Sequence, residues 1–200
     1  MIIKRLSGAI LGMALAMTAS PVSAATLVLN GGGELTGARG VSVGGALYDV
    51  DFVDGTCVDL FTGCDENSDF TFAGDNVTAE LAAEALHNQV FIGVFDDNPS
   101  LTHGCTGLLC IAWTPVSVSG LTVGGLNAFN LSLAANANGS PDFVAFNQIE
   151  SSRDFADEPS DVWARWSEVS TVPLPAAGWM LLFAVACLAG LGRRVGQRPV

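Results

Sequence analysis

The sequence predicts a mainly β domain, an antiparallel arrangement similar to a β-sandwich with one α-helix, between an N-terminal signal helix and a C-terminal transmembrane helix. Three observations predict this fold class. Short runs rich in β-branched and aromatic residues alternate with Gly, Pro and Asn throughout residues 25–170, as is typical of strands and turns. Residues 77–89 have helical periodicity instead. Apolar and basic residues are concentrated at the two chain ends.

The first segment, residues 1–24, is predicted to be a secretory signal peptide. Lys4 and Arg5 precede an apolar run, and small residues at Val22-Ser23-Ala24 suit a signal peptidase. An N-terminal membrane anchor is the alternative, but the run is short beside the ~20 residues that a spanning helix needs. We therefore expect cleavage after Ala24 or Ala25 and export of the residues that follow.

Glycine pairs place two hairpins in the exported segment. After a first strand at residues 26–30, residues 41–48 consist of two short β-type runs joined by Gly44-Gly45. Residues 121–128 repeat this pattern around Gly124-Gly125. Adjacent glycines take the positive φ angles of a type I′ turn, so each pair is predicted to close a hairpin.

Alternation then defines the second strand of the first hairpin, residues 47–53. Its odd positions include Asp49 and Asp51, so Tyr48, Val50 and Phe52 are expected to face the core and the two acids the solvent. The remaining strands are expected at residues 69–73, 90–95, 109–113, 116–119, 128–133, 143–149 and 162–169.

One helix interrupts the strands, at residues 77–89. Its apolar residues at helical spacing are Val77, Leu81, Ala85 and Leu86. Asp75 or Asn76 stands where an N-cap is needed, and Glu80 lies near the positive end of the helix dipole. We expect this helix to lie across or beside the β-structure.

The charge distribution excludes nucleic acid as a partner. All 20 acidic side chains lie within residues 25–170, with only three arginines and no lysine, so this segment has a formal charge of −17. Such a surface repels phosphate backbones, whereas nucleic-acid binding needs the opposite sign. The length of the segment suits a single domain with one core.

Four cysteines lie in the exported segment, and the fifth, Cys187, lies in the apolar tail. In an oxidising compartment four cysteines indicate two disulfides, for which three pairings exist. We favour Cys57 with Cys64 and Cys105 with Cys110, because each pair brackets a short, turn-rich loop. Zinc ligation is the alternative, but the spacing of the first pair fits a zinc knuckle poorly.

Candidate catalytic and metal-binding residues are few. His87 and His103 have no nucleophile at a recognised spacing, since Cys105 is expected in a disulfide, and no Gly-x-Ser-x-Gly motif is present. Acids crowd residues 49–69, and a second acidic turn contains Asp96 and Asp97. Calcium binding by these loops is one interpretation; the other, which we favour, is a solvated acidic surface without a cofactor.

Three tryptophans offer a possible carbohydrate-binding surface. Trp113, Trp163 and Trp166 could stack on sugars, although burial in a core is the commoner role of tryptophan. Trp163 and Trp166 are three residues apart and lie on opposite faces of a strand. At least one of them is therefore expected to be exposed or at a sheet edge.

The C-terminal tail has three parts in a fixed order. A short motif with two prolines is followed by an apolar segment of 17 residues, 176–192, and then by three arginines, Arg193, Arg194 and Arg198. The apolar segment is just long enough to cross a bilayer, and the arginines are expected to stay cytoplasmic. The prolines keep the motif extended outside the membrane, where a protease can reach it. The motif consists of Val172, Pro173, Leu174, Pro175 and Ala176.

This tail, residues 171–200, resembles the PEP-CTERM class of sorting signals, in the variant whose motif is Val-Pro-Leu-Pro-Ala. The resemblance implies export in a Gram-negative bacterium and recognition of the tail by a membrane-embedded exosortase. It also implies cleavage, with attachment or release at the cell surface. The alternative is that the tail is an ordinary single-span membrane anchor. The basic end departs from the usual arginine cluster, since Gly196, Gln197, Pro199 and Val200 dilute it.

The sequence thus predicts a non-enzymatic surface or extracellular-matrix protein with a disulfide-bonded domain at residues 25–170. Its expected partners are the inner membrane, an exosortase-type enzyme and exopolysaccharide. The expected location is the inner membrane with a periplasmic domain, followed by the cell surface or the medium. The alternative is a secreted carbohydrate-binding domain or hydrolase that uses the acidic loops or the tryptophans.

Overall fold

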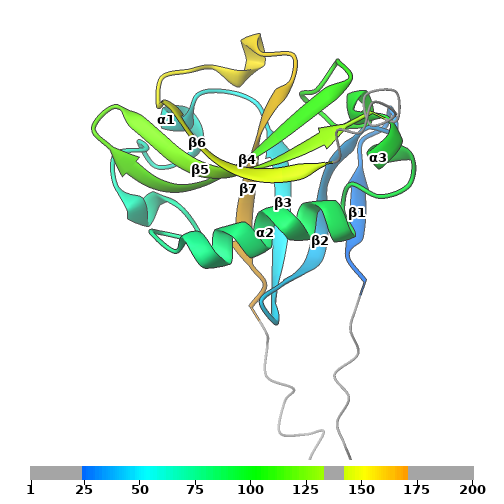
Figure 1. The fold of residues 1–200 in the computed structure, drawn as a ribbon, viewed down its shortest axis with the longest axis horizontal. Helices are drawn as coiled ribbons and strands as arrows, with labels where there is room; N and C mark the ends of the chain where they lie inside the picture. Colours follow the sequence, from blue (N-terminus) through cyan, green and yellow to red (C-terminus); the bar gives the residue numbers. More distant parts are fainter. Residues whose placement is uncertain (1–23, 133–141, 171–200) are drawn as a thin grey trace, which may run out of the picture.

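The computed structural model describes residues 24–132 and 142–170. Seven strands make up most of this domain (Figure 1). They are β1 (Thr26–Leu29), β2 (Leu35–Val43), β3 (Ala46–Val53), β4 (Leu109–Ser119), β5 (Thr122–Leu131), β6 (Phe143–Glu150) and β7 (Asp161–Glu168). The helices are α1 (Cys57–Leu60), α2 (Asn76–Gln89) and α3 (Val94–Asp97), with 3₁₀ turns η1 (Asn67–Asp69), η2 (Pro99–Leu101) and η3 (Phe155–Asp157).

The described strands form one sheet, in the order β1-β2-β3-β7-β4-β5-β6. The prediction of a mainly β domain is confirmed, but the expected antiparallel sandwich of two sheets is wrong. β7 follows the far edge strand β6 and returns to the middle of the sheet, where it joins β1-β2-β3 to β4-β5-β6. It pairs antiparallel with β3 and parallel with β4, so the sheet is mixed.

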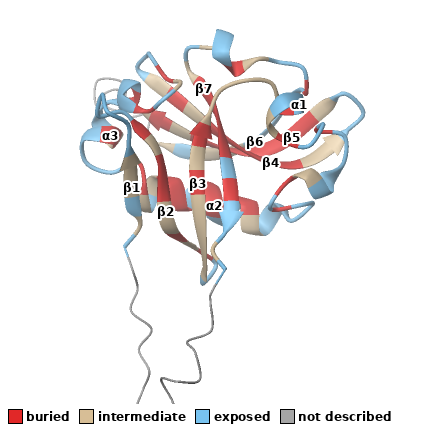
Figure 2. Ribbon diagram, turned by 180° about the vertical axis from the view of Figure 1, so that it is seen from behind, coloured by how far each residue is buried: buried red, intermediate tan, exposed pale blue. Residues whose placement is uncertain are grey.

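Two clusters of buried side chains form the cores of the domain, one on each face of the sheet. Of the strands between them, β4, β5 and β7 are largely buried (Figure 2). The larger core lies between the sheet and α2 and includes Val162, Ala164 and Trp166 of β7. The smaller core lies on the opposite face, where Trp163 packs with residues of the loops around α1, η1 and η3. The expectation of a single core is therefore wrong, because alternate residues of β7 enter different cores.

The predicted helix is confirmed as α2, and Asp75 is its N-cap. The Asp75 carboxylate accepts hydrogen bonds from the backbone N–H groups of Val77 and Thr78, both at 3.1 Å. The predicted apolar face is only half correct, since Val77 is 70% exposed and Leu81 40% exposed. Small residues form most of the buried face instead, which consists of Ala79, Ala82, Ala83, Ala85 and Leu86.

The two glycine pairs have different roles. Gly44 and Gly45 have φ angles of 58° and 92° and join β2 to β3, so the first predicted hairpin is confirmed. The second is wrong, because Gly124-Gly125 lies inside β5. The turn between β4 and β5 is closed earlier, at Gly120, which has a φ of 65°.

The strands expected at residues 26–30, 143–149 and 162–169 are confirmed as β1, β6 and β7, and the one expected from residue 128 lies in β5. The segments 109–113 and 116–119 form one strand, β4, which passes through a register shift after Pro115. The strands predicted at 69–73 and 90–95 are wrong. The first segment begins at the last residue of η1 and places its two phenylalanines in different cores. The second segment includes the first two residues of α3.

The domain begins and ends at the same end of the sheet. Thr26, the first residue of β1, pairs with Arg39, and Glu168, the last residue of β7, pairs with Tyr48. Tyr48 in turn pairs with Val41. The start of β1 is thus level with Arg39 of β2 and the end of β7 with Val41, about two residues along the same strand. Helix α1 lies at the opposite end of the domain (Figure 1).

The predicted signal helix within residues 1–24 and the predicted transmembrane segment 176–192 lie outside the described residues, apart from Ala24. Within residues 24–132 and 142–170, no helix has the length and apolar character that a membrane span requires.

Candidate functional site

The cysteines are paired as the loop lengths predict. Cys57 is bonded to Cys64 and Cys105 to Cys110, with Cα–Cα distances of 5.7 and 5.5 Å. The first bridge lies in the smaller core and the second in the larger core. All four thiols are therefore engaged, and none is free to ligate zinc.

The three tryptophans do not form a sugar-binding surface. Trp163 is fully buried, and Trp113 and Trp166 are only 6% and 5% exposed. Trp163 and Trp166 do lie on opposite faces of β7, but both faces are covered there, so the expectation that one is exposed is wrong. Each indole N–H donates a hydrogen bond within the domain. Trp113 donates to the Asp161 carboxylate, Trp163 to the Gly55 carbonyl and Trp166 to the Thr114 hydroxyl.

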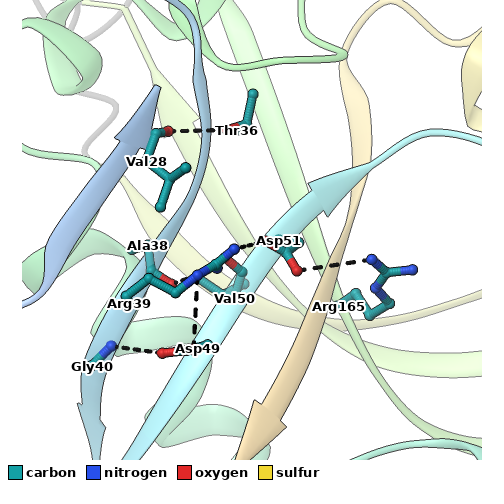
Figure 3. Close-up of polar contacts among 9 residues, drawn as sticks. All are labelled: Val28, Thr36, Ala38, Arg39, Gly40, Asp49, Val50, Asp51 and Arg165. Atoms are coloured by element: carbon teal, nitrogen blue, oxygen red, sulfur yellow. Dashed lines mark hydrogen bonds and ion pairs between the residues drawn. The ribbon is translucent and has the colours of Figure 1, made fainter. Parts of the chain in front are cut away.

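Two acids expected to face solvent, Asp49 and Asp51, lie in an ion-pair network on the open part of the sheet (Figure 3). Asp51 accepts a hydrogen bond of 2.6 Å from the Arg39 guanidinium and lies 3.8 Å from Arg165. Asp49 lies 3.8 Å from the Nε atom of Arg39. Arg39 also donates to the backbone carbonyl of Val50, so it holds β2 against β3 where their register shifts. This cluster has a structural role.

Several other acids of residues 49–69 cap turns. Asp69 accepts hydrogen bonds from the backbone N–H groups of Asp65 and Glu66. Burial raises the pKa of Asp54. The charge of His103 opposes this rise, and the charge of Asp154 adds to it. Within the described part of the chain, no group of three or more His, Cys, Asp and Glu side chains is arranged to hold a metal ion.

The two histidines have different environments. His103 is half-exposed, and its Nδ1 atom lies 3.8 Å from a carboxylate oxygen of Glu34. His87 is largely buried near the end of α2, where its Nε2 atom lies 3.3 Å from the backbone carbonyl of Phe143 and its Nδ1 atom 3.9 Å from Asp142. His87 therefore connects α2 to the start of β6.

A groove of about 430 Å³ opens beside His87, and we take it as the candidate binding site. Its α2 wall is a polar stripe of Glu80, Glu84, His87 and Asn88. Its other wall consists of Asp142, Phe143 and Val144, at the start of β6. The groove combines three carboxylates with an aromatic wall, so it suits a ligand that is both cationic and partly apolar.

Electrostatics in this groove depend on burial. Loss of water lowers the pKa of His87, although the Phe143 carbonyl and the charges of Asp142 and Glu84 oppose this effect. Burial likewise raises the pKa of Asp96, and its hydrogen bond to Asp142 adds to the rise. His87 is therefore favoured in its neutral form, and the acids give the groove its negative charge.

The lowered pKa of His87 predicts a loss of stability in mild acid. The unfolded chain binds a proton near the ordinary histidine value of 6.5, whereas folded His87 resists protonation until a lower pH. The free energy of unfolding should thus fall as the pH drops below 6.5 and stop falling below the lowered pKa. The His87→Gln variant should lose this part of the pH profile.

The measurement is urea denaturation from neutral pH to about pH 5, where histidine titrates. His103→Gln removes the other histidine and is the matched control. Parallel profiles for the wild type and His87→Gln would contradict a buried, neutral His87.

Sequence reasoning missed the groove because its walls are far apart in the chain. Glu80, Glu84 and His87 share one helical stripe, which the spacing of the predicted helix already contained. Nothing local indicated that residues 142–144 would lie opposite that stripe. The predicted sorting motif Val172–Ala176 and the three arginines of the tail lie outside the described residues.

Comparison with known proteins found no matching family model, no matching curated protein and no matching solved structure.

Proposed function

We propose that this chain is a non-enzymatic exported protein of a Gram-negative cell surface or extracellular matrix. Its tail, residues 171–200, anchors it in the inner membrane, and an exosortase-type enzyme then processes the tail at Val172–Ala176. The tail motif is the basis of this proposal, and two features of the domain support it.

The arrangement of the domain's ends is the first supporting feature. The sequence that follows β7 leaves the sheet at the end where β1 begins, and α1 lies at the opposite end (Figure 1). A tail that leads directly from this end into a membrane would hold the domain upright, with the loops around α1 directed away from the bilayer. Such a domain tolerates a tether and its removal equally well, because no strand has to be rearranged.

The disulfides are the second supporting feature. Both bridges are buried, and both close short loops. Disulfides form and persist mainly in oxidising compartments. Two such bridges agree with export of the domain to an oxidising compartment.

The alternative of a sugar-binding domain receives less support, because all three of its candidate tryptophans are buried. For the alternative of a hydrolase, the acidic groove beside α2 is a candidate cleft, but none of the described residues that line it is a serine, threonine or cysteine nucleophile. We therefore keep the non-enzymatic surface protein as the proposed function, with exopolysaccharide as a proposed matrix partner.

Substitution of both tail prolines tests the proposal. In the Pro173→Ala and Pro175→Ala double variant, helix can extend outward from Ala176 and hide the motif from a protease. In a host strain that contains an exosortase, the wild type should be shortened, whereas the double variant should accumulate at full length in the inner membrane. Immunoblotting of membrane, surface and medium fractions measures this difference.

Pro199→Ala removes a tail proline outside the motif and is the matched control, which should be processed like the wild type. If the wild type and the double variant both stay at full length in the membrane, the tail is a plain anchor and the sorting proposal is wrong.

A further inference from the structure

Among the described strands, β6 is an edge strand without the usual protection against pairing. It pairs with β5 in unbroken register over eight residues, from Phe143 opposite Phe129 to Glu150 opposite Thr122, and no described strand pairs with its other side. Between Asp142 and Glu150 it contains no charged residue and no proline. Folded proteins commonly protect an edge with lysine, proline, a bulge or a short strand. β6 has none of these, whereas the opposite edge strand, β1, is only four residues long and contains a register shift.

The groove lies beside the first residues of β6, at the edge strand of the described sheet. The sheet curves around α2, and β6 runs alongside α2 in the opposite direction (Figure 1). A strand added to β6 would therefore pass next to the polar stripe of α2 that contains Glu80, Glu84 and His87. Alternate side chains of such a strand would face this stripe.

Charge decides the kind of strand that fits. The groove presents Glu80, Glu84 and Asp142, and it contains no basic side chain besides the largely neutral His87. Apolar surface is available on both faces of β6, because Phe143 and Phe146 are each 47% exposed and belong to opposite faces of the strand. A suitable strand thus has basic side chains on one face and apolar side chains on the other.

A second copy of this domain is a poor source of such a basic strand. Residues 25–170 contain no lysine, and the three arginines are all paired with acids, Arg39 and Arg165 with Asp51, and Arg153 with Glu158. The arginines of the tail are expected on the cytoplasmic side of the membrane. We therefore infer an occupant from another protein.

We propose that the groove between α2 and β6 binds an extended basic segment of a partner protein, which adds to β6 as an eighth strand. Main-chain hydrogen bonds to β6 provide affinity, and lysine or arginine side chains facing Glu80 and Glu84 provide specificity. This site is independent of the proposed tail processing, and its test does not depend on cleavage.

The probe is a fluorescein-labelled peptide of alternating lysine and valine, as long as β6, and its binding to the full-length chain is measured by fluorescence anisotropy. A peptide of alternating glutamate and valine should not bind.

Two further probes are N-methylated at every lysine or at every valine. In an added strand, alternate N–H groups point toward β6, so one of these two peptides should lose binding and the other should keep it. If both methylated peptides bind as well as the parent, no strand is added and the proposal is overturned.

Charge reversal in the protein tests the location of the site. Glu84 is exposed, and its carboxylate makes no hydrogen bond among the described residues, so Glu84→Lys should fold normally. It should weaken binding of the lysine peptide about tenfold, because it replaces an attraction by a repulsion. It should also gain affinity for the glutamate peptide. Glu168→Lys makes the same change in net charge at the end of β7 and should leave both affinities unchanged. Equal losses in the two variants would mean a general attraction to an acidic protein and would overturn the proposal.

Discussion

Replacement of Trp163 by alanine should lower the free energy of unfolding by about 4 kcal/mol, the cost typical of removing a large buried aromatic side chain. Trp163 is fully buried at the centre of the smaller core. Its ring stacks on Phe155 at a centroid distance of 4.4 Å. It also meets the ring of Phe61 edge-on and that of Trp113 at a tilt. The variant leaves a large cavity and also removes the N–H group that bonds to the Gly55 carbonyl.

Urea denaturation measures this loss, and Trp163→Phe is the matched control. Phenylalanine keeps an aromatic ring beside Phe155 but loses the hydrogen bond and some volume, so it should cost about half as much. A cost below about 1 kcal/mol for Trp163→Ala would match a surface position. That result would contradict a second core under α1, η1 and η3.

Elements that depend on local signals were predictable from the sequence. The helix α2 has a cap residue, Asp75, at the right distance from its apolar residues, and both signals lie within 15 residues of chain. The hairpin at Gly44-Gly45 likewise requires only a turn and two flanking runs. The two disulfides join cysteines that are seven and five residues apart, so loop length alone indicates the pairing.

Features that depend on distant pairing were not predictable. Nothing in residues 161–168 indicates that β7 inserts between β3 and β4, and this insertion is what joins all seven strands into one sheet. The second core follows from the same step, because it forms where loops cover the outer face of β7. The sequence alone consequently leaves Trp163 and Trp166 as candidates for a surface, although both sides of their strand are buried.

The candidate groove was half predictable. Its α2 wall follows from the helix, where Glu80, Glu84 and His87 lie at successive turns. Its β6 wall is 56 residues away from His87 in the chain, and the two meet only because the sheet curves around the helix. A site built from one local element and one distant edge strand is visible only in the folded chain.

Gly125→Ala should destabilise the domain by about 3 kcal/mol, the upper range for overpacking, whereas Gly124→Ala should cost about 1 kcal/mol or less. A Cβ atom on Gly125 would lie 2.7 Å from the backbone oxygen of Thr114 and 3.2 Å from the Cα atom of Pro115. These are main-chain atoms of the neighbouring strand, so β4 and β5 would have to separate. A Cβ atom on Gly124 would instead meet side chains, the ring of Phe146 at 2.7 Å and the hydroxyl of Ser117 at 3.0 Å.

The difference between the two alanine variants identifies what the glycine pair does. Phe146 is 47% exposed, so its ring can rotate away from a methyl group at position 124 at little cost, but no rotation relieves a clash with backbone. A type I′ turn at this pair, as the sequence alone suggests, would need positive φ at both positions and would make both variants costly by similar amounts, about 1–2 kcal/mol each. Urea denaturation of both variants separates the two cases. A cost for Gly125→Ala that clearly exceeds that for Gly124→Ala supports close strand packing, and equal costs would place the turn at Gly124-Gly125 and contradict the register of β5.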